Sequence, residues 1–416
     1  MIFKSLPTGR GRLVVTIPNT EQYGHLALEI LMSFLLAKEQ GASRVRFLVP
    51  DQVVNPALLQ LRTPGIDVIG PWHPLSLLTL PWQAQRGVLR VRVSLRKAIR
   101  RREMYGDTRF PEWFRDLVYW YDESTTEAIR RDTFKDDVPY YRRALMRRPI
   151  QVALPESTLA QARAEAARIG LDPDARIVTL HAREGGFKAG REMSGFRKDH
   201  TRNAHIENYF DLMDDLVRRG YTVVRVGDPS MTPVSRPGVI DLATSPLRTG
   251  LVDLFCLMKS VFMVGCESGP YGVVYLTDTP SLIVNCTDPI SAFPIRANML
   301  HVLKLVRDYK SGQILSLQDM LTERYLKHLR DVRRYEYIEN SAEDLVEAGA
   351  EMVEFVERGL PETPLQSTYK ARVVSTAEEL RDRYSYVRKW GPEDGFMGDG
   401  RLGGAFLERY WETAPA

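Results

Sequence analysis

The first part of the chain alternates between apolar, β-branched runs and longer amphipathic stretches. Apolar runs at residues 12–18, 45–49 and 66–69 predict three strands. The apolar stretch from Leu26 to Gln40 predicts a helix, and Gly41 follows where a helix C-terminal glycine belongs. Strands that alternate with helices at this spacing are typical of parallel β-α-β units.

The same alternation is clearer in the second half. The strands predicted there cover residues 176–180, 222–226, 239–242, 261–264 and 281–285, and the predicted helices cover 160–169, 208–219 and 251–260. This order describes a second open parallel sheet, which would bind its ligand beyond the carboxyl ends of its strands.

A chain of 416 residues is too long for one hydrophobic core, so we expect an α/β protein with two Rossmann-like domains that face each other across a cleft. The N-terminal domain is expected over residues 1–150 and the second over 151–340, with a linker near 148–155. Residues 341–416 are expected to form a helical segment and tail that pack back on the N-terminal domain.

Composition narrows the class of protein. The chain is 44% hydrophobic and 26% charged, with a formal net charge of +4, which does not favour nucleic-acid binding. No secretory signal is visible, and the most apolar helix candidate is too short to span a bilayer. Cys256, Cys266 and Cys286 lie in or beside apolar segments, which favours buried thiols over catalytic ones and predicts a cytoplasmic protein.

The stretch from Val264 to Pro270 carries the most chemical information. An apolar strand leads into Glu267, Ser268 and Gly269, and an apolar stretch that could begin a helix follows Pro270. A turn between a strand and a helix start directs backbone N–H groups outward, and these groups favour an anion such as a phosphate or diphosphate. The alternative is an ordinary strand-to-helix connection.

Other polar residues of the second half also follow predicted strands. They are His181, Arg183, Lys188, Arg202, Gly227 and Asp228. Because the carboxyl ends of parallel strands share one edge of a sheet, we expect these residues to meet Ser268 there. The guanidinium of Arg183 could offer two parallel hydrogen bonds to a diphosphate, although it could also form a salt bridge with Glu184 or Asp228. Lys188 could equally belong to a solvated loop face.

Several familiar motifs are absent from the sequence. There is no G-x-x-x-x-G-K-[ST], which argues against a P-loop kinase or ATPase, and no dinucleotide-binding fingerprint follows the first strand. No histidine pair and no cysteine pair has metal-ligand spacing, so we expect neither a metal nor a cofactor.

In the first half, Tyr23, Gly24 and His25 form a glycine turn after the first strand, on what would be the acceptor side. His25 is a candidate general base because the reference pKa of histidine is close to 6.5, with Glu21 and Glu29 as substitutes. The alternative for His25 is a local hydrogen bond at a helix start.

The segment Val264–Pro270, with residues 279–285 after it, resembles the donor site of heptosyltransferase-like glycosyltransferases of the GT-B fold. That family usually has Asp where this chain has Glu267. The elements His181-Ala-Arg183, Arg202-Asn203 and 220–228 are similar to a bacterial glycosyltransferase family of surface-polysaccharide and natural-product clusters, and the His-x-Arg element resembles protein O-fucosyltransferases.

The resemblance implies a metal-independent glycosyltransferase that moves a sugar from a nucleotide-activated donor to an acceptor hydroxyl or other nucleophile. It places Arg183 and the Ser268–Gly269 turn on the diphosphate, Gly227 and Asp228 near the nucleoside, and Glu267 on ribose or sugar hydroxyls. The catalytic candidates are His25, Arg183 and Glu267. The acceptor would be a small molecule, a glycan or a carrier-linked group. An epimerase or hydrolase on the same fold, or a non-catalytic nucleotide-sugar-binding protein, are the alternatives.

A basic run from Arg90 to Arg102 is the remaining feature. It is a candidate for weak association with the inner face of a membrane, and a solvated helix face is the alternative.

Overall fold

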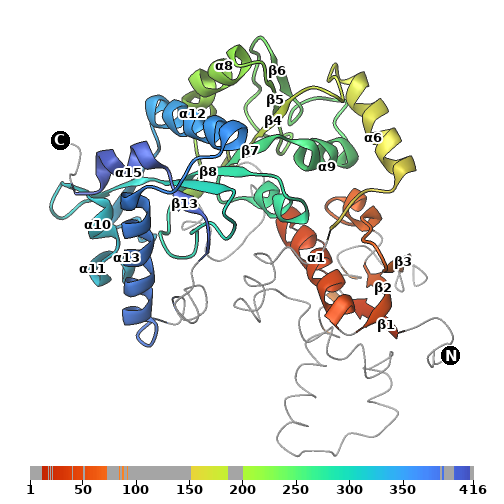
Figure 1. Cartoon of the computed structure of the whole chain (residues 1–416), viewed down its shortest axis with the longest axis horizontal. Coiled ribbons are helices and arrows are strands. Elements are labelled where there is room, and N and C mark those ends of the chain that lie inside the picture. Colours follow the sequence, from red (N-terminus) through yellow and green to blue (C-terminus); the bar gives the residue numbers. More distant parts are fainter. Residues whose placement is uncertain are drawn as a thin grey trace, which may run out of the picture. The chain divides into compact units, whose positions relative to one another are not determined.

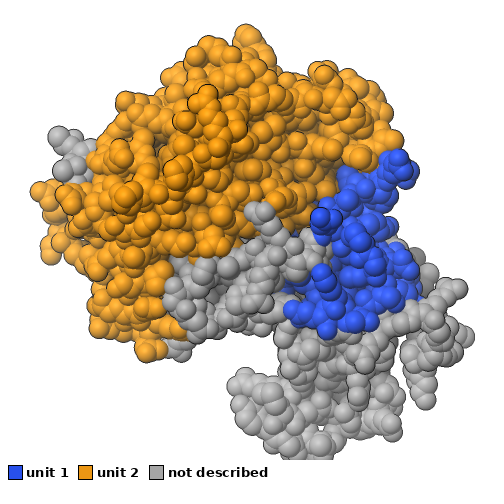
Figure 2. Space-filling view, in the orientation of Figure 1, with its two compact units in different colours: residues 1–137, 148–158 blue, residues 138–147, 159–416 orange. Residues whose placement is uncertain are grey.

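The structure is a computed structural model, and it divides into two compact units. Unit 1 comprises Met1–Asp137 and Arg148–Thr158, and unit 2 comprises Val138–Arg147 and Leu159–Ala416 (Figure 2). The residues that it describes are 12–16, 18, 20, 22–39, 41–49, 52–72, 84, 87, 88, 91, 151–185, 200–384, 387 and 398–412. Glu21, Lys188 and the basic residues of the Arg90–Arg102 run lie outside this set. The cleft between two facing domains stays a prediction.

The described part of unit 1 contains a parallel sheet in the order β1-β2-β3. Its elements are β1 (Arg12–Thr16), α1 (Tyr23–Glu39), β2 (Ala42–Leu48), the 3-10 turn η1 (Pro56–Gln60) and β3 (Asp67–Trp72). Helix α1 is buried along most of its length, and its Ser33 hydroxyl lies 2.8 Å from the Thr16 hydroxyl of β1. The strands and the helix predicted here are confirmed, although α1 begins at Tyr23, three residues earlier than predicted.

Unit 2 is built on a larger parallel sheet. Within the described residues it has the order β13-β9-β8-β7-β4-β5-β6, and every neighbouring pair is parallel. The strands are β4 (Ile177–Leu180), β5 (Thr222–Arg225), β6 (Val239–Asp241), β7 (Phe262–Gly265), β8 (Ser281–Cys286), β9 (Met299–Leu303) and β13 (Arg401–Leu402). The central strands are buried on both faces, which explains their nearly continuous apolar sequences.

The strand order reverses direction at β4. The chain runs outward from β4 through β5 to β6, returns to place β7 on the other side of β4, and then continues outward through β8 and β9. The right-handed crossover rule places α8 (Phe210–Arg218) and α9 (Gly250–Lys259) on opposite faces of the sheet, and Figure 1 shows them on different sides of it. The pair β4 and β7 therefore forms the topological switch point.

The C-terminal segment contributes to unit 2. Its helices are α12 (Ala342–Arg358), α13 (Pro364–Leu380) and α15 (Gly404–Tyr410), and β13 adds to the sheet beside β9. Capping boxes begin α12 and α13, at Ser341 and Thr363. The predicted packing of residues 341–416 against the N-terminal domain stays a prediction.

A small antiparallel sheet in the order β11-β10-β12 completes the described part of unit 2. Its strands are β10 (Leu305–Asp308), β11 (Ile314–Leu315) and β12 (Tyr335–Ile338), and α10 (Leu317–Met320) and α11 (Glu323–Leu326) lie between β11 and β12 in sequence. The remaining elements are α6 (Glu156–Arg168) and the 3-10 turns η4 (His200–Arg202) and η5 (Ile206–Tyr209).

Three further predictions can be compared with the structure. Apart from the helix start after Ser268, the strands and helices predicted between residues 160 and 285 are confirmed, and all three cysteines are buried and free. The helix predicted after Ser268 is wrong in type. The chain forms two short 3-10 turns there, η6 (Gly269–Gly272) and η7 (Val274–Leu276), and the Ser268 side chain does not cap the first.

Candidate functional site

The carboxyl ends of β4, β5 and β7 are joined at the switch point by hydrogen bonds. The backbone N–H of His181 donates to the carbonyl of Val264 at 2.9 Å, and that of Val226 donates to the carbonyl of Leu180 at 2.9 Å. Side chains extend these links, because His181 Nε2 lies 2.9 Å from Ser268 Oγ. The structure thus joins the ends of β4, β5 and β7 and brings His181 into contact with Ser268, whereas Lys188 lies outside the described residues.

His181 is buried, and the geometry assigns its proton. Its Nδ1 lies 2.9 Å from the carbonyl of Val226, which can only accept, so Nδ1 carries the hydrogen. Burial, reinforced by the positive charges of Arg225 and Arg183, lowers the pKa of His181 to about 4. The ring is therefore neutral at pH 7, its Nε2 accepts, and the hydroxyl of Ser268 donates to it.

Cationic side chains gather around the end of β7. Arg183 Nη1 donates to Asn203 Oδ1 at 2.9 Å, Arg202 Nη1 donates to the carbonyl of Glu267 at 3.1 Å, and Lys304 Nζ donates to the carbonyl of Asn203 at 2.6 Å. Burial raises the pKa of the nearby Cys266 thiol to about 11 despite the positive charges of Arg183, Arg202 and Lys304. These three charges make the β4–β7 edge favourable for an anion.

The carboxylate of Glu267 is engaged within the protein. Its Oε2 accepts from the backbone N–H of Thr287 at 2.9 Å and from the Thr287 hydroxyl at 2.8 Å. Its Oε1 accepts from Arg330 Nη2 at 2.8 Å, and Arg330 Nε donates to the Thr287 hydroxyl at 2.7 Å. Burial alone would raise the pKa of Glu267, but Arg330 and Arg202 together with the Thr287 hydrogen bonds outweigh it, so the pKa is lowered.

A buried arginine supports the loop after β5. Arg225 is fully buried and donates to Glu184 at 2.7 Å, to both oxygens of Asp241 at 3.2 Å and to the carbonyl of Thr232 at 2.6 Å. Glu184, which the sequence analysis considered as a partner of Arg183, also accepts from the backbone and hydroxyl of Thr232, each at 2.9 Å.

The two predicted nucleoside-side residues lie in that loop. Asp228 accepts from the backbone of Ser230 at 3.0 Å and from its hydroxyl. At Gly227 a Cβ atom would come within 2.4 Å of the Met231 sulfur and 3.4 Å of His181 Nδ1. Glycine at this position therefore leaves room for the Met231 side chain to pack against the loop.

The predicted acceptor-side residues belong to unit 1. Tyr23, Gly24 and His25 form the first turn of α1, and the Tyr23 and His25 side chains are half-buried. Glu29, a substitute base in the sequence analysis, is buried in the same helix. The role of His25 as a base stays a prediction.

Sequence reasoning missed three residues of the edge, namely Thr287, Lys304 and Arg330. Thr287 and Lys304 follow β8 and β9, so strand ends were the signal that could have found them. Arg330 comes from the basic segment between α11 and β12, and its backbone has a φ of 60°, which is unusual for a residue other than glycine. Only the long-range pairing with Glu267 distinguishes it from the arginines around it.

No group of three or more His, Cys, Asp or Glu side chains suited to a metal occurs in the described parts of the chain. None of the described helices is long and apolar enough to cross a membrane. The expected independence from metal and cofactor stays a prediction.

These features define a parallel α/β unit with a cationic edge at its switch point. No protein-family model and no curated protein matches the chain. Among solved structures it is similar to a glycosyl transferase family 9 protein from Veillonella parvula, with 14% identity and a TM-score of 0.45 over 84% of this chain and 99% of that one.

A second similar structure is the ADP-heptose LPS heptosyltransferase II of E. coli. It shares 14% identity, with a TM-score of 0.38 over 65% of this chain and 84% of that one. Because both TM-scores lie below 0.5, neither likeness bears on the activity of this chain.

Proposed function

We propose that the chain is a glycosyltransferase of the GT-B type that takes its sugar from a nucleotide-activated donor and needs no metal. Unit 2 holds the donor, with the diphosphate at the carboxyl ends of β4 and β7. Unit 1 holds the acceptor, whose hydroxyl or other nucleophile loses its proton to His25. The reaction belongs to surface-polysaccharide or natural-product biosynthesis.

One observation carries the proposal. The switch point of the sheet lies between β4 and β7, and the cationic residues Arg183 and Arg202 stand where those two strands end. In open α/β sheets a ligand binds in the crevice at such a point. A diphosphate is the ligand that fits an edge with several cations and a glycine-containing turn.

The chemical demand on this edge is the negative charge that develops on the departing nucleoside diphosphate. Arg183 stabilises that charge directly, and each charge-assisted hydrogen bond contributes about 1.5–3 kcal/mol. The Ser268 hydroxyl donates to His181, so the turn contributes backbone N–H groups rather than this hydroxyl. We assign the donor to His181, Arg183, Arg202, Gly227, Asp228, Ser268 and Gly269, and the assignment of Lys188 stays a prediction from the sequence.

Glu267 has two roles in this proposal. Its hydrogen bonds within the protein fix the residues at the end of β7, and the remaining lone pairs of its carboxylate accept hydrogen bonds from the sugar or ribose. Its two oxygens already accept from Thr287 and Arg330. An ionised carboxylate that is held in this way with a lowered pKa is a weak base at neutral pH. We therefore assign proton removal to His25 and not to Glu267.

Turnover with and without an acceptor tests the reaction class. A panel of nucleoside diphosphates in a thermal-shift assay first selects the nucleotide, and the matching nucleotide sugars are then incubated with the protein. A glycosyltransferase releases nucleoside diphosphate in proportion to added acceptor. If the protein releases as much nucleoside diphosphate from the donor alone, it is a hydrolase. If it converts the donor sugar to another sugar, it is an epimerase. Binding of the donor without any turnover would indicate a non-catalytic protein.

The Arg183→Ala variant tests the assignment of the edge. We expect kcat/KM to fall at least a hundredfold, because a ligand to the developing charge is lost. The exposed Arg358 of α12 provides a matched control, and Arg358→Ala should leave kcat/KM unchanged. Near-normal kcat/KM in Arg183→Ala would contradict the proposal.

A further inference from the structure

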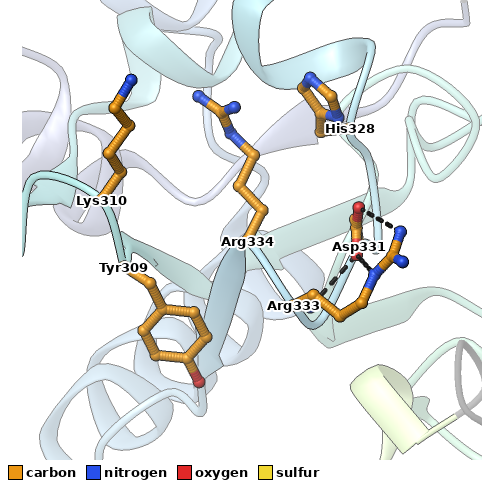
Figure 3. A pocket seen from close by; sticks show the side chains of 6 residues that line it. All are labelled: Tyr309, Lys310, His328, Asp331, Arg333 and Arg334. Atoms are coloured by element: carbon orange, nitrogen blue, oxygen red, sulfur yellow. Dashed lines mark hydrogen bonds and ion pairs between the residues drawn. The ribbon is translucent and has the colours of Figure 1, made fainter.

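A second cationic site lies in a depression of unit 2, and it shares no lining residue with the β4–β7 edge. It is lined by Tyr309, Lys310, His328, Asp331, Arg333 and Arg334 (Figure 3). Its volume of about 560 Å³ falls within the range of about 300–1,000 Å³ that is usual for small-molecule sites. The depression is therefore large enough for a ligand of several groups.

The residues that line the depression come from two loops, which a backbone hydrogen bond joins. Tyr309 and Lys310 follow β10, whereas the other residues precede β12. The backbone N–H of Tyr309 donates to the carbonyl of Arg334 at 3.0 Å. Asp308, which is buried, accepts from the backbone N–H of Lys310 at 2.9 Å and from Arg324 at 2.8 Å. The cations are thus held on a preorganised frame.

Positive charge exceeds negative charge in this depression. Lys310, Arg324, Arg333 and Arg334 carry four positive charges, and the carboxylates they contact, Asp308 and Asp331, carry two, which leaves an excess of two. Asp331 is turned toward Arg333, with atoms 3.0 Å apart, and Asp308 reaches Arg334 only at 3.6 Å.

Two cationic groups retain capacity for a ligand. Within the described residues, Lys310 forms no ion pair, and Arg334 reaches its carboxylate partner, Asp308, only at 3.6 Å. Figure 3 shows the nitrogen-bearing ends of Lys310, Arg334 and His328 on one side of the depression. Lys310 can therefore donate to an acceptor of a ligand without first breaking an ion pair.

We propose that this depression binds a phosphate group of a second ligand, independent of the donor. A phosphate presents several acceptor oxygens and about two negative charges, which match an excess of two cations better than a single carboxylate does. Tyr309 is 56% exposed, and its ring gives an apolar surface beside the cations for the part of the ligand that bears the phosphate. Both a soluble phosphorylated molecule and a phospholipid headgroup supply this chemistry.

The test compares two double variants of the full chain. Lys310→Ala/Arg333→Ala removes two exposed cations of the depression, and Arg358→Ala/Arg372→Ala removes two exposed cations of α12 and α13. Pyrophosphate is titrated calorimetrically into each, in wild-type and Arg183→Ala backgrounds. The Arg183→Ala background separates binding of pyrophosphate at the depression from binding at the β4–β7 edge. If Arg183→Ala alone titrates like the wild type, the proposed function fails, and the comparison of the double variants still tests the depression.

We expect pyrophosphate to bind the Arg183→Ala protein, and the affinity to fall roughly tenfold or more when Lys310→Ala/Arg333→Ala is added. The α12–α13 control should retain the affinity. Equal affinity in both double variants, with equal melting temperatures, would overturn the proposal.

Vesicle flotation identifies the source of the phosphate. Retention on vesicles that contain phosphatidic acid but not on pure phosphatidylcholine, lost in Lys310→Ala/Arg333→Ala, would support a lipid phosphate. Pyrophosphate binding without such retention would support a soluble ligand.

Discussion

The neutral ring of His181 determines what Ser268 can offer to a ligand. Because Nδ1–H is held by the carbonyl of Val226, Nε2 takes the proton of the Ser268 hydroxyl. A phosphate oxygen is an acceptor and would have to displace that hydrogen bond to use the hydroxyl. The side chain of Ser268 therefore orients the turn, and its neighbours bind the anion.

The Ser268→Ala variant should accordingly lose less than about threefold in affinity for the preferred nucleoside diphosphate, since only a neutral hydrogen bond within the protein is removed. Titration calorimetry on Ser268→Ala and Arg183→Ala provides the comparison, and the second variant should lose at least tenfold. A loss of tenfold or more in Ser268→Ala would show that the hydroxyl itself contacts the ligand.

Two buried histidines make the free energy of unfolding depend on pH. Burial lowers the pKa of His181 to about 4 and that of His301 to about 3. Between the unfolded value near 6.5 and these folded values, the unfolded chain binds more protons than the folded chain, so stability falls as pH falls. From pH 7 to pH 5 each histidine removes about 2 kcal/mol.

His301→Phe tests this account, because neither ring nitrogen of His301 has a hydrogen-bond partner in the part of the chain that the structure describes. Phenylalanine keeps an aromatic ring beside Phe293 and Tyr369 without a titrating group. Denaturant unfolding at pH 7 and pH 5 should show a decrease about 2 kcal/mol smaller in the variant than in the wild type. An identical decrease would exclude His301 as a source of the pH dependence.

One segment, between α11 and β12, contributes residues to two sites of unit 2. The segment between α11 and β12 provides Arg330 to Glu267 at the end of β7 and, a few residues later, Arg333 and Arg334 to the second depression. Its backbone turns at Arg330 with a φ of 60°. The ion pair with Glu267 and a hydrogen bond from the Arg330 backbone N–H to the Tyr337 hydroxyl hold the chain at this turn.

Replacing Arg330 by methionine should lower the free energy of unfolding by about 1.5–3 kcal/mol, since Glu267 would lose its cationic partner while remaining mostly buried. The double variant Glu267→Gln/Arg330→Met should recover part of this loss, because no uncompensated charge remains. Denaturant unfolding of the two single variants and the double variant measures the coupling. Strict additivity would mean that the two side chains do not depend on each other.

The edge strand β13 depends on a glycine that precedes it. A Cβ atom on Gly400 would lie 2.3 Å from the Pro294 side chain and 2.9 Å from the carbonyl oxygen of Met299. The Gly400→Ala variant should therefore destabilise unit 2 by about 1–3 kcal/mol, as overpacking generally does. Gly404→Ala is the matched control in the same segment, because its nearest contact would be at 3.4 Å. Equal melting temperatures for both variants would contradict the tight packing of β13.

The elements that sequence predicted best are those with a strong local signal. The β-branched runs of β4, β5 and β7 and the amphipathic helix α8 follow from side-chain periodicity alone. The strands β9 to β13 were not predicted. The turn after Ser268 was predicted as a helix start, but Gly269, Pro270 and Gly272 support only a 3-10 turn.

The architecture of unit 2 explains why the site could be predicted in part. Parallel strands place their carboxyl ends on one edge, so residues 181, 183, 227 and 268 could be grouped without coordinates. The strand order, which makes β4 and β7 the switch point, and the partners Thr287 and Arg330 required the folded chain. The local sequence therefore predicted which strand ends form the edge, but it did not predict the hydrogen bonds and the ion pair that hold the edge together.

A crystal structure of the chain with the nucleoside diphosphate selected by thermal shift tests the central claim most directly. We predict that the diphosphate lies at the carboxyl ends of β4 and β7, with the Arg183 guanidinium and the backbone N–H groups around Ser268 within hydrogen-bonding distance. A diphosphate bound elsewhere, with Arg183 directed away from it, would contradict the account.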